Sequence, residues 1–127
     1  MKLITNNPLL KEEAIGGNIE LVFIDGWPDE VLSYGRDLVH QGYPLACDPG
    51  AGRFSSRKSP YITLFIKEKK VPSSFEQISA LESLIRQEAQ AHWDCRAEMQ
   101  FDYQSLNQAY SQVCLEKLGE KRRDFRE

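Results

Sequence analysis

The chain has 127 residues, a formal net charge of −3 and 41% hydrophobic residues. This is the size and composition of one globular domain, and it excludes a disordered or fibrous protein. The longest apolar stretches, residues 21–24 and 62–66, are far shorter than a membrane span, and the first residues lack the apolar core of a signal peptide. Three cysteines without a CxxC pair favour neither a disulfide framework nor a zinc site, so we expect a cytoplasmic protein.

The first third of the chain predicts two strands and two helices in alternation. Residues 2–5 form a short apolar run that ends in Asn-Asn-Pro, which is typical of a helix cap followed by proline, so we expect a helix over 8–15. Residues 19–24 predict a strand, and the Asp-Gly that follows predicts its exit turn. A second helix should begin near Pro28 and end before Gly42.

The rest of the chain predicts a long loop, another strand and two helices. Residues 42–60 are rich in Gly, Pro and Ser, and a short strand at 45–47 is the only regular element expected there. Residues 61–67 give the clearest strand. A capping box opens a helix over 73–92, and a last helix is expected over 103–118.

This order of elements predicts a small three-layer α/β sandwich with a mainly parallel sheet of three or four strands and a C-terminal helical pair. Residues 1–120 should form a single domain, and residues 121–127 a charged tail that frays. Ligands of such sheets gather beyond the carboxyl ends of the strands. Those ends carry Thr5–Asn7, Asp25–Gly26 and Cys47–Gly52.

Two candidate ligand sites follow the first two strands. Asn6 and Asn7 lie at a strand-to-helix turn, where backbone N–H groups and the helix dipole favour an anion. The commoner interpretation is that Asn7 only caps the helix. Asp25 could hold a ribose hydroxyl, although an ordinary Asp-Gly turn is more frequent and no GxGxxG follows the first strand.

The long loop carries a second set of candidates. Gly50 and Gly52 would allow the backbone to approach a ligand closely, and Arg53 and Arg57 could bind a phosphate or a carboxylate beside Asp48. A solvated surface loop explains the same composition equally well. The Walker A pattern is absent, so a nucleotide-binding loop of that type is not expected.

The charge is distributed unevenly along the chain. Residues 1–48 carry three basic and eight acidic side chains, whereas residues 49–71 carry six basic and one acidic. The acidic total argues against a general nucleic-acid binder. The basic segment indicates where to look for a ligand.

His40 and Cys47 are the candidates for catalysis. His40, near the end of the second helix, could act as an acid or base, but the helix dipole explains a histidine there without any function. Cys47 could be a nucleophile if nearby basic residues lowered its pKa, whereas a small buried residue is the commoner case. The hypothesis of an enzyme gains support if His40 lies within hydrogen-bond reach of Cys47 or Asp48 in a pocket at the strand ends.

Several short motifs occur within residues 3–66: ITNNPL (4–9), FIDG (23–26), H-x-G-Y-P-L (40–45), D-P-x-x-G (48–52) and SPY (59–61). Together they resemble the GrdX family, which is named for a small open reading frame found with glycine reductase genes in amino-acid-fermenting bacteria. Asp48 stands where the family pattern has histidine. The resemblance implies an accessory place near glycine, sarcosine or betaine reductase, and it implies neither a reaction nor a cofactor.

Two functions are therefore expected. The first is a non-catalytic accessory or regulatory protein that binds a small phosphate- or carboxylate-bearing ligand or a protein partner such as a reductase component. The second is a small enzyme that acts on a phosphorylated or acyl metabolite. Tyr110 and Val113 of the last helix could also form the seam of a homodimer. In the first hypothesis the ligand is bound by Asn6, Asn7, Asp25, His40, Asp48, Gly50, Gly52, Arg53 and Arg57.

Overall fold

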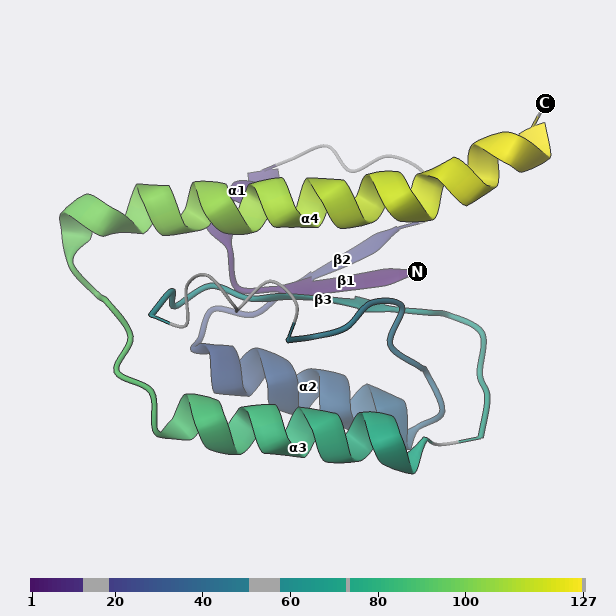
Figure 1. The fold of residues 1–127 in the computed structure, drawn as a ribbon, viewed down its shortest axis with the longest axis horizontal. Coiled ribbons are helices and arrows are strands. Elements are labelled where there is room, and N and C mark those ends of the chain that lie inside the picture. Colours follow the sequence, from purple (N-terminus) through teal and green to yellow (C-terminus); the bar gives the residue numbers. More distant parts are fainter. Residues whose placement is uncertain (13–18, 51–57, 73, 127) are drawn as a thin grey trace.

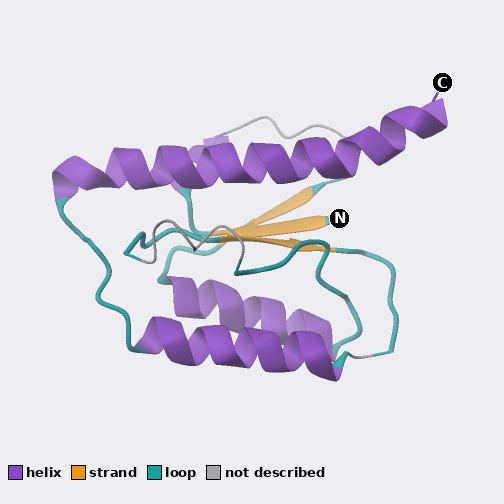
Figure 2. Ribbon diagram, viewed as in Figure 1, coloured by secondary structure: helices purple, strands orange, loops and turns teal. Residues whose placement is uncertain are grey.

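A computed structural model describes residues 1–12, 19–50, 58–72 and 74–126. Two helices cover each face of a central sheet, so the expected three-layer sandwich is confirmed (Figure 1). Helices α2 and α3 form one outer layer, and α1 and α4 form the other (Figure 2). The elements in chain order are β1 (Lys2–Thr5), α1 (Pro8–Glu12), β2 (Glu20–Phe23), α2 (Pro28–His40), β3 (Thr63–Ile66), α3 (Phe75–Ala89) and α4 (Ala97–Arg126).

The sheet has three strands in the order β2-β1-β3. β1 pairs in parallel with β2, placing Ile4 opposite Val22, and pairs antiparallel with β3, placing Ile4 opposite Leu64. The predicted mainly parallel sheet is therefore wrong, because one of the two pairings is antiparallel.

The expected strand at 45–47 explains this difference. It is reduced to an isolated antiparallel bridge between Leu45 and Ile66, supported by a hydrogen bond from the Ala46 N–H to the Phe65 carbonyl. The segment after α2 therefore runs parallel to β1, as a βαβ unit requires, but it pairs with the outer edge of β3 and not with β1. β3 then returns in the opposite direction and occupies the place beside β1.

The main core lies between the sheet and the α2–α3 layer. α2 approaches β3 so closely that a Cβ atom at Gly35 would lie 2.5 Å from Leu64 Cδ1, so any larger residue there would force the Leu64 side chain to shift. α3 begins after Ser74, whose hydroxyl accepts a hydrogen bond from the Gln77 N–H. The helix cap is therefore one residue later than the predicted capping box.

A second core lies between the sheet and α4, and it includes Leu3, Leu10, Phe65 and Cys114. α4 begins at Ala97, before the expected start near residue 103, and its backbone remains helical to Arg126 through the segment expected to fray. The two predicted C-terminal helices are present, but they lie on opposite faces of the sheet. α3 packs on α2, and the connection that follows crosses the edge of the sheet and carries α4 to the other face (Figure 1).

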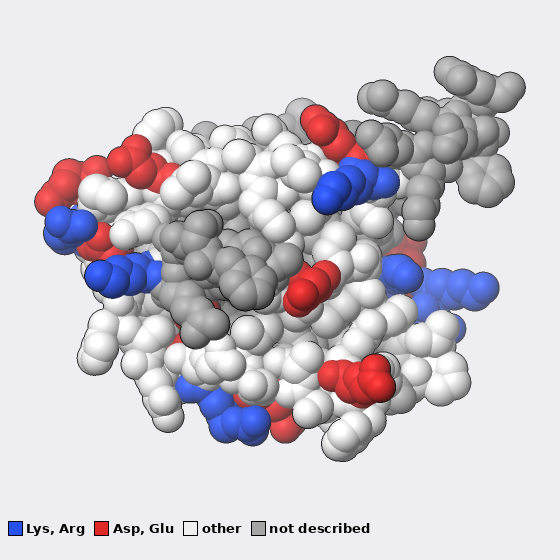
Figure 3. All heavy atoms as spheres, viewed as in Figure 1, with Lys and Arg blue, Asp and Glu red and all other residues white. Residues whose placement is uncertain are grey.

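The outer side of α4 bears exposed apolar side chains. Leu106 is 61% exposed and Val113 is 48% exposed, whereas Tyr110 packs against the second core. The homodimer seam stays a prediction. Basic and acidic side chains of the described residues are interspersed over the face shown in Figure 3. No helix in the described parts of the chain is long and apolar enough to cross a membrane.

Candidate functional site

A cavity of about 530 Å³ lies where β1 and β2 end and α2 begins. The parallel pairing of these strands brings Asn6 and Asp25 to the same edge of the sheet, as the sequence predicts. The segment before α4 closes the other side. The cavity is lined by Asn6, Pro8, Phe23, Asp25, Gly26, Trp27, Pro60, Tyr61, Cys95 and Gln100.

Asn6 holds this edge of the sheet together. Its Nδ2 donates to the carbonyl oxygens of Gly26 at 2.9 Å and Pro60 at 2.7 Å, and its Oδ1 accepts from the Ile62 N–H at 2.9 Å. The side chain is almost fully buried. Both amide hydrogens of Asn6 are therefore used inside the protein, and its role as a ligand-binding residue stays a prediction.

Asn7 caps α1, which was the commoner of its two interpretations. Its Oδ1 accepts a hydrogen bond from the Leu9 N–H at 3.0 Å. Its Nδ2 donates to the Gln104 carbonyl at 2.9 Å and to Asn107 Oδ1 at 3.0 Å, both on α4. Asn7 is completely buried, so it connects the two helices of this layer without facing the cavity.

Aromatic side chains form much of the cavity wall. Trp27 precedes the first residue of α2 and stacks on Trp93, with ring centroids 5.0 Å apart and an angle of 7° between the ring planes. The Trp93 indole N–H donates to Glu88 Oε2 at 2.8 Å. The Tyr61 hydroxyl donates to Gln100 Oε1 at 3.1 Å, which fixes a second ring.

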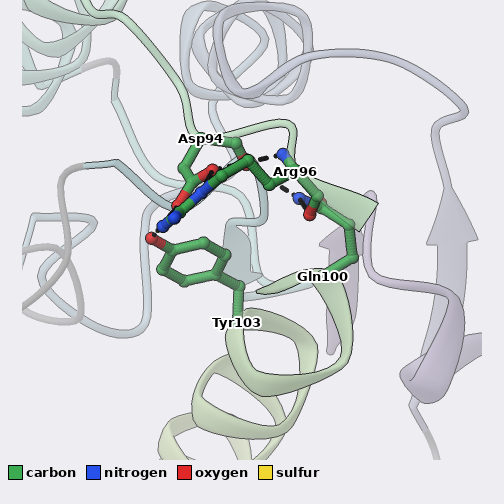
Figure 4. Close-up of polar contacts among 4 residues, drawn as sticks. All are labelled: Asp94, Arg96, Gln100 and Tyr103. Atoms are coloured by element: carbon green, nitrogen blue, oxygen red, sulfur yellow. Dashed lines mark hydrogen bonds and ion pairs between the residues drawn. The ribbon is translucent and has the colours of Figure 1, made fainter. Parts of the chain in front are cut away.

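A compact polar cluster positions the segment that carries Cys95 and Gln100 (Figure 4). Two hydrogen bonds join the Arg96 guanidinium to the Asp94 carboxylate at 2.9 and 2.8 Å, and the Tyr103 hydroxyl donates to Asp94 Oδ2 at 2.8 Å. Gln100 Nε2 donates to the Asp94 and Arg96 carbonyls. The Arg96 and Tyr103 bonds hold the pKa of Asp94 well below its ordinary value, and they outweigh the opposing effect of desolvation.

A second cavity, of about 270 Å³, lies between the loop after α2 and the start of α3, and Cys47 and Asp48 line it. Burial and the neighbouring thiol of Cys114 raise the pKa of Cys47 to about 11, although Lys117 and Lys67 act in the opposite direction. Cys47 is therefore protonated at neutral pH, which makes it a poor nucleophile. Asp48 Oδ1 accepts from the Gly50 N–H at 2.9 Å, so it stabilises its own turn.

The candidate residues therefore fall into separate groups. Asn6 and Asp25 share the larger cavity, and Cys47 and Asp48 share the smaller one. His40 is exposed at the last residue of α2 and lines neither cavity. Three further candidates lie outside the described residues: Gly52, Arg53 and Arg57.

The sequence does not indicate most residues of the larger cavity. Cys95 and Gln100 carry no local signal, because only the chain crossing between α3 and α4 brings them to the strand ends. Phe23 and Tyr61 have the pattern of strand core residues. Pro8, Gly26 and Trp27 lie within two residues of predicted site residues, so these lining residues could have been added from the sequence. Among the described residues, no group of three or more His, Cys, Asp or Glu side chains could hold a metal ion.

Comparison with known proteins identifies a family for this chain. The GrdX family model, described as GrdX-like protein, matches residues 2–114. No curated protein and no solved structure matches the chain. The match includes β1 to β3, α3 and more than half of α4, so it extends well beyond the short motifs in residues 3–66. On this match over most of its length, the chain belongs to the GrdX-like protein family.

Proposed function

We propose that this chain is a non-catalytic accessory or regulatory protein of glycine, sarcosine or betaine reductase metabolism. In this role it binds a small ligand in the cavity at the ends of β1 and β2. Membership of the GrdX-like family associates the chain with the glycine reductase gene context. The observation that carries the proposal is the cavity itself, which combines Asn6 and Asp25 with three aromatic rings.

The form of the cavity supports binding. Its volume of about 530 Å³ is in the range of small-molecule sites, which are mostly apolar with a few placed polar groups. Hydrogen bonds within the protein already fix Asn6, and stacking fixes Trp27. A wall that is rigid before binding costs little conformational entropy when a ligand enters.

The alternative, a small enzyme that uses His40 or Cys47, has less support. The raised pKa of Cys47 keeps its thiol protonated, and Lys67 and Lys117 do not reverse this. His40 lines neither the cavity of Cys47 nor the larger one. An anion site formed by Arg53 and Arg57 depends on residues outside the described ranges and stays a prediction.

Calorimetry with glycine, sarcosine, betaine, phosphate and acetyl phosphate tests the binding role. We expect at least one of these compounds to bind the wild-type protein. Cys95→Phe, which places a ring in the cavity, should weaken that binding by about tenfold or more. Ala97→Phe is the matched control, because Ala97 is exposed and does not line the cavity. Equal binding by the wild type and Cys95→Phe would contradict the proposal, as would a lack of binding by every compound.

The accessory role has its own experiment. The tagged protein should capture glycine, sarcosine or betaine reductase subunits from a lysate of cells that ferment the corresponding compound. Capture that persists in Cys95→Phe would separate partner binding from ligand binding. Repeated failure to recover any reductase subunit would count against the accessory role.

A further inference from the structure

We propose that the cavity at the ends of β1 and β2 takes a small organic ammonium ion, held against aromatic rings with Asp25 as its counter-charge. The inference rests on the proposed function, because it names the class of ligand for the same cavity. It follows from three features of the described lining: its rings, its charge and its rigidity.

Aromatic rings suit a cation in this position. The faces of Trp, Tyr and Phe attract an ammonium ion within about 6 Å of the ring centre, and Trp does so best. Trp27 is 45% exposed although Trp93 covers one of its faces. Trp93 does not line the cavity. Trp27 therefore faces the cavity with its edge or with the ring face that Trp93 does not cover. Tyr61 contributes a further ring.

Phe23 already makes such a contact within the protein. The Lys11 ammonium lies 4.8 Å from the centre of the Phe23 ring. A second cation beside Lys11 would be repelled, so the ligand ammonium is expected nearer to Trp27 and Tyr61. Phe23 then serves as apolar wall for the ligand's carbon atoms.

The charge of the lining also favours a cation. Asp25 is the one charged side chain among the described residues that line the cavity, and no Lys or Arg side chain accompanies it there. A carboxylate beside aromatic faces attracts an ammonium ion and repels a phosphate or carboxylate. A small quaternary ammonium compound is compatible with the cavity volume of about 530 Å³.

The rings are held in place before any ligand binds. Trp93 is anchored to Glu88 by a 2.8 Å hydrogen bond, and Trp27 stacks on Trp93. The Tyr61 hydroxyl donates to Gln100 and accepts from Gln104 Nε2 at 2.8 Å. Support of this kind from surrounding residues is what a precise binding site requires.

Calorimetry with choline and its neutral carbon isostere tests the ligand class. In the isostere a tert-butyl group replaces the trimethylammonium group, so the two probes share their shape and differ in charge. We expect choline to bind wild-type protein about tenfold or more tightly than the isostere. Asp25→Asn should weaken choline binding by about fivefold or more, whereas Asp29→Asn, which removes the same charge outside the cavity, should leave it unchanged.

Three results would overturn the inference. They are equal binding of the two probes, binding of phosphate or acetate in place of choline, and choline binding that survives both Asp25→Asn and Trp27→Leu. If an anion or the neutral isostere binds and Cys95→Phe weakens it, the ligand class is wrong and the cavity remains a binding site. If none of these probes and none of the reductase metabolites binds, both the inference and the proposed binding role fail. Asp25→Asn and the probe pair do not depend on whether Trp27→Leu folds.

Discussion

The indole rings of Trp27 and Trp93 lie nearly parallel, 5.0 Å apart, and they are the two tryptophans of the chain. Trp27 precedes α2, and Trp93 follows α3. Their stacking fixes the start of one helix against the end of its neighbour at the rim of the larger cavity. The pair therefore couples the packing of the α2–α3 layer to the shape of the candidate site.

Two substitutions of Trp93 should separate the contribution of its stacking on Trp27 from that of its hydrogen bond to Glu88. Trp93→Leu removes the stacking and the hydrogen bond to Glu88, and we expect it to lower the free energy of unfolding by about 1 to 2 kcal/mol. Trp93→Phe keeps a ring stacked on Trp27, so its free energy of unfolding should fall by about half as much. Urea unfolding measures both, and circular dichroism should show the loss of coupling between the indoles. Wild-type stability in Trp93→Leu would mean that the stack does not hold this rim.

The sequence predicts one side of the cavity and misses the other. Asn6 and Asp25 follow parallel strands, and the rule that ligands gather at such ends needs only local patterns. Cys95 and Gln100 arrive from a chain crossing that no local pattern encodes. Similarly, the alternation of strands and helices predicts parallel pairing throughout the sheet. β3 is antiparallel to β1 because it is inserted between β1 and the Leu45 segment, and no local pattern indicates that insertion.

Asn7 is expected to be structural, and substitutions can show it. Asn7→Ala removes the cap of α1 and the two hydrogen bonds to α4, and we expect it to lower the free energy of unfolding by about 2 to 3 kcal/mol. Asn7→Ser restores a capping oxygen but not the bonds to Gln104 and Asn107, so it should recover about 1 kcal/mol. Denaturant titration of both variants measures the effect.

The result for Asn7 also bears on the candidate anion site. If Asn7 acted mainly on a ligand, Asn7→Ala would lose binding while keeping wild-type stability. A stability unchanged from that of the wild type would therefore contradict the structural role. Asn7 lies outside the cavity lining, so ligand binding per folded molecule should be retained in Asn7→Ser.

Alkylation rates can test the state of the Cys47 thiol. Its pKa of about 11, against an ordinary value of 9.0, should make Cys47 react with iodoacetamide about a hundredfold more slowly at neutral pH in the folded protein than in urea. Cys114 is buried and should also be protected. Cys95 is exposed, so it should react in the folded protein. Mass spectrometry of timed samples gives each rate. Rapid labelling of Cys47 in the folded state would restore the case for a nucleophile.

The Asp94 cluster predicts a loss of stability in acid. The Arg96 and Tyr103 bonds lower the pKa of Asp94 in the folded protein below its ordinary value of 3.8. Below about pH 4 the unfolded chain therefore binds a proton at Asp94 that the folded protein does not, so falling pH favours unfolding. The stabilising contribution is fully present above that pH and is lost progressively as the pH falls toward the folded-state pKa.

Urea unfolding between pH 6 and about pH 3 measures this dependence. Asp94→Asn should be less stable than the wild type at pH 6, and the difference should shrink as the pH falls, because the wild-type protein loses part of the contribution of Asp94. Asp102→Asn is the matched control, since Asp102 is an exposed carboxylate on α4, the helix that begins three residues after Asp94. A difference that stays constant with pH, or one that Asp102→Asn reproduces, would show that the Asp94 cluster does not set the acid stability. The folded protein keeps Asp94 ionised over this range, so the cluster that positions Cys95 and Gln100 stays intact, and its contribution to ligand binding per folded molecule should not change until the pH approaches the folded-state pKa of Asp94.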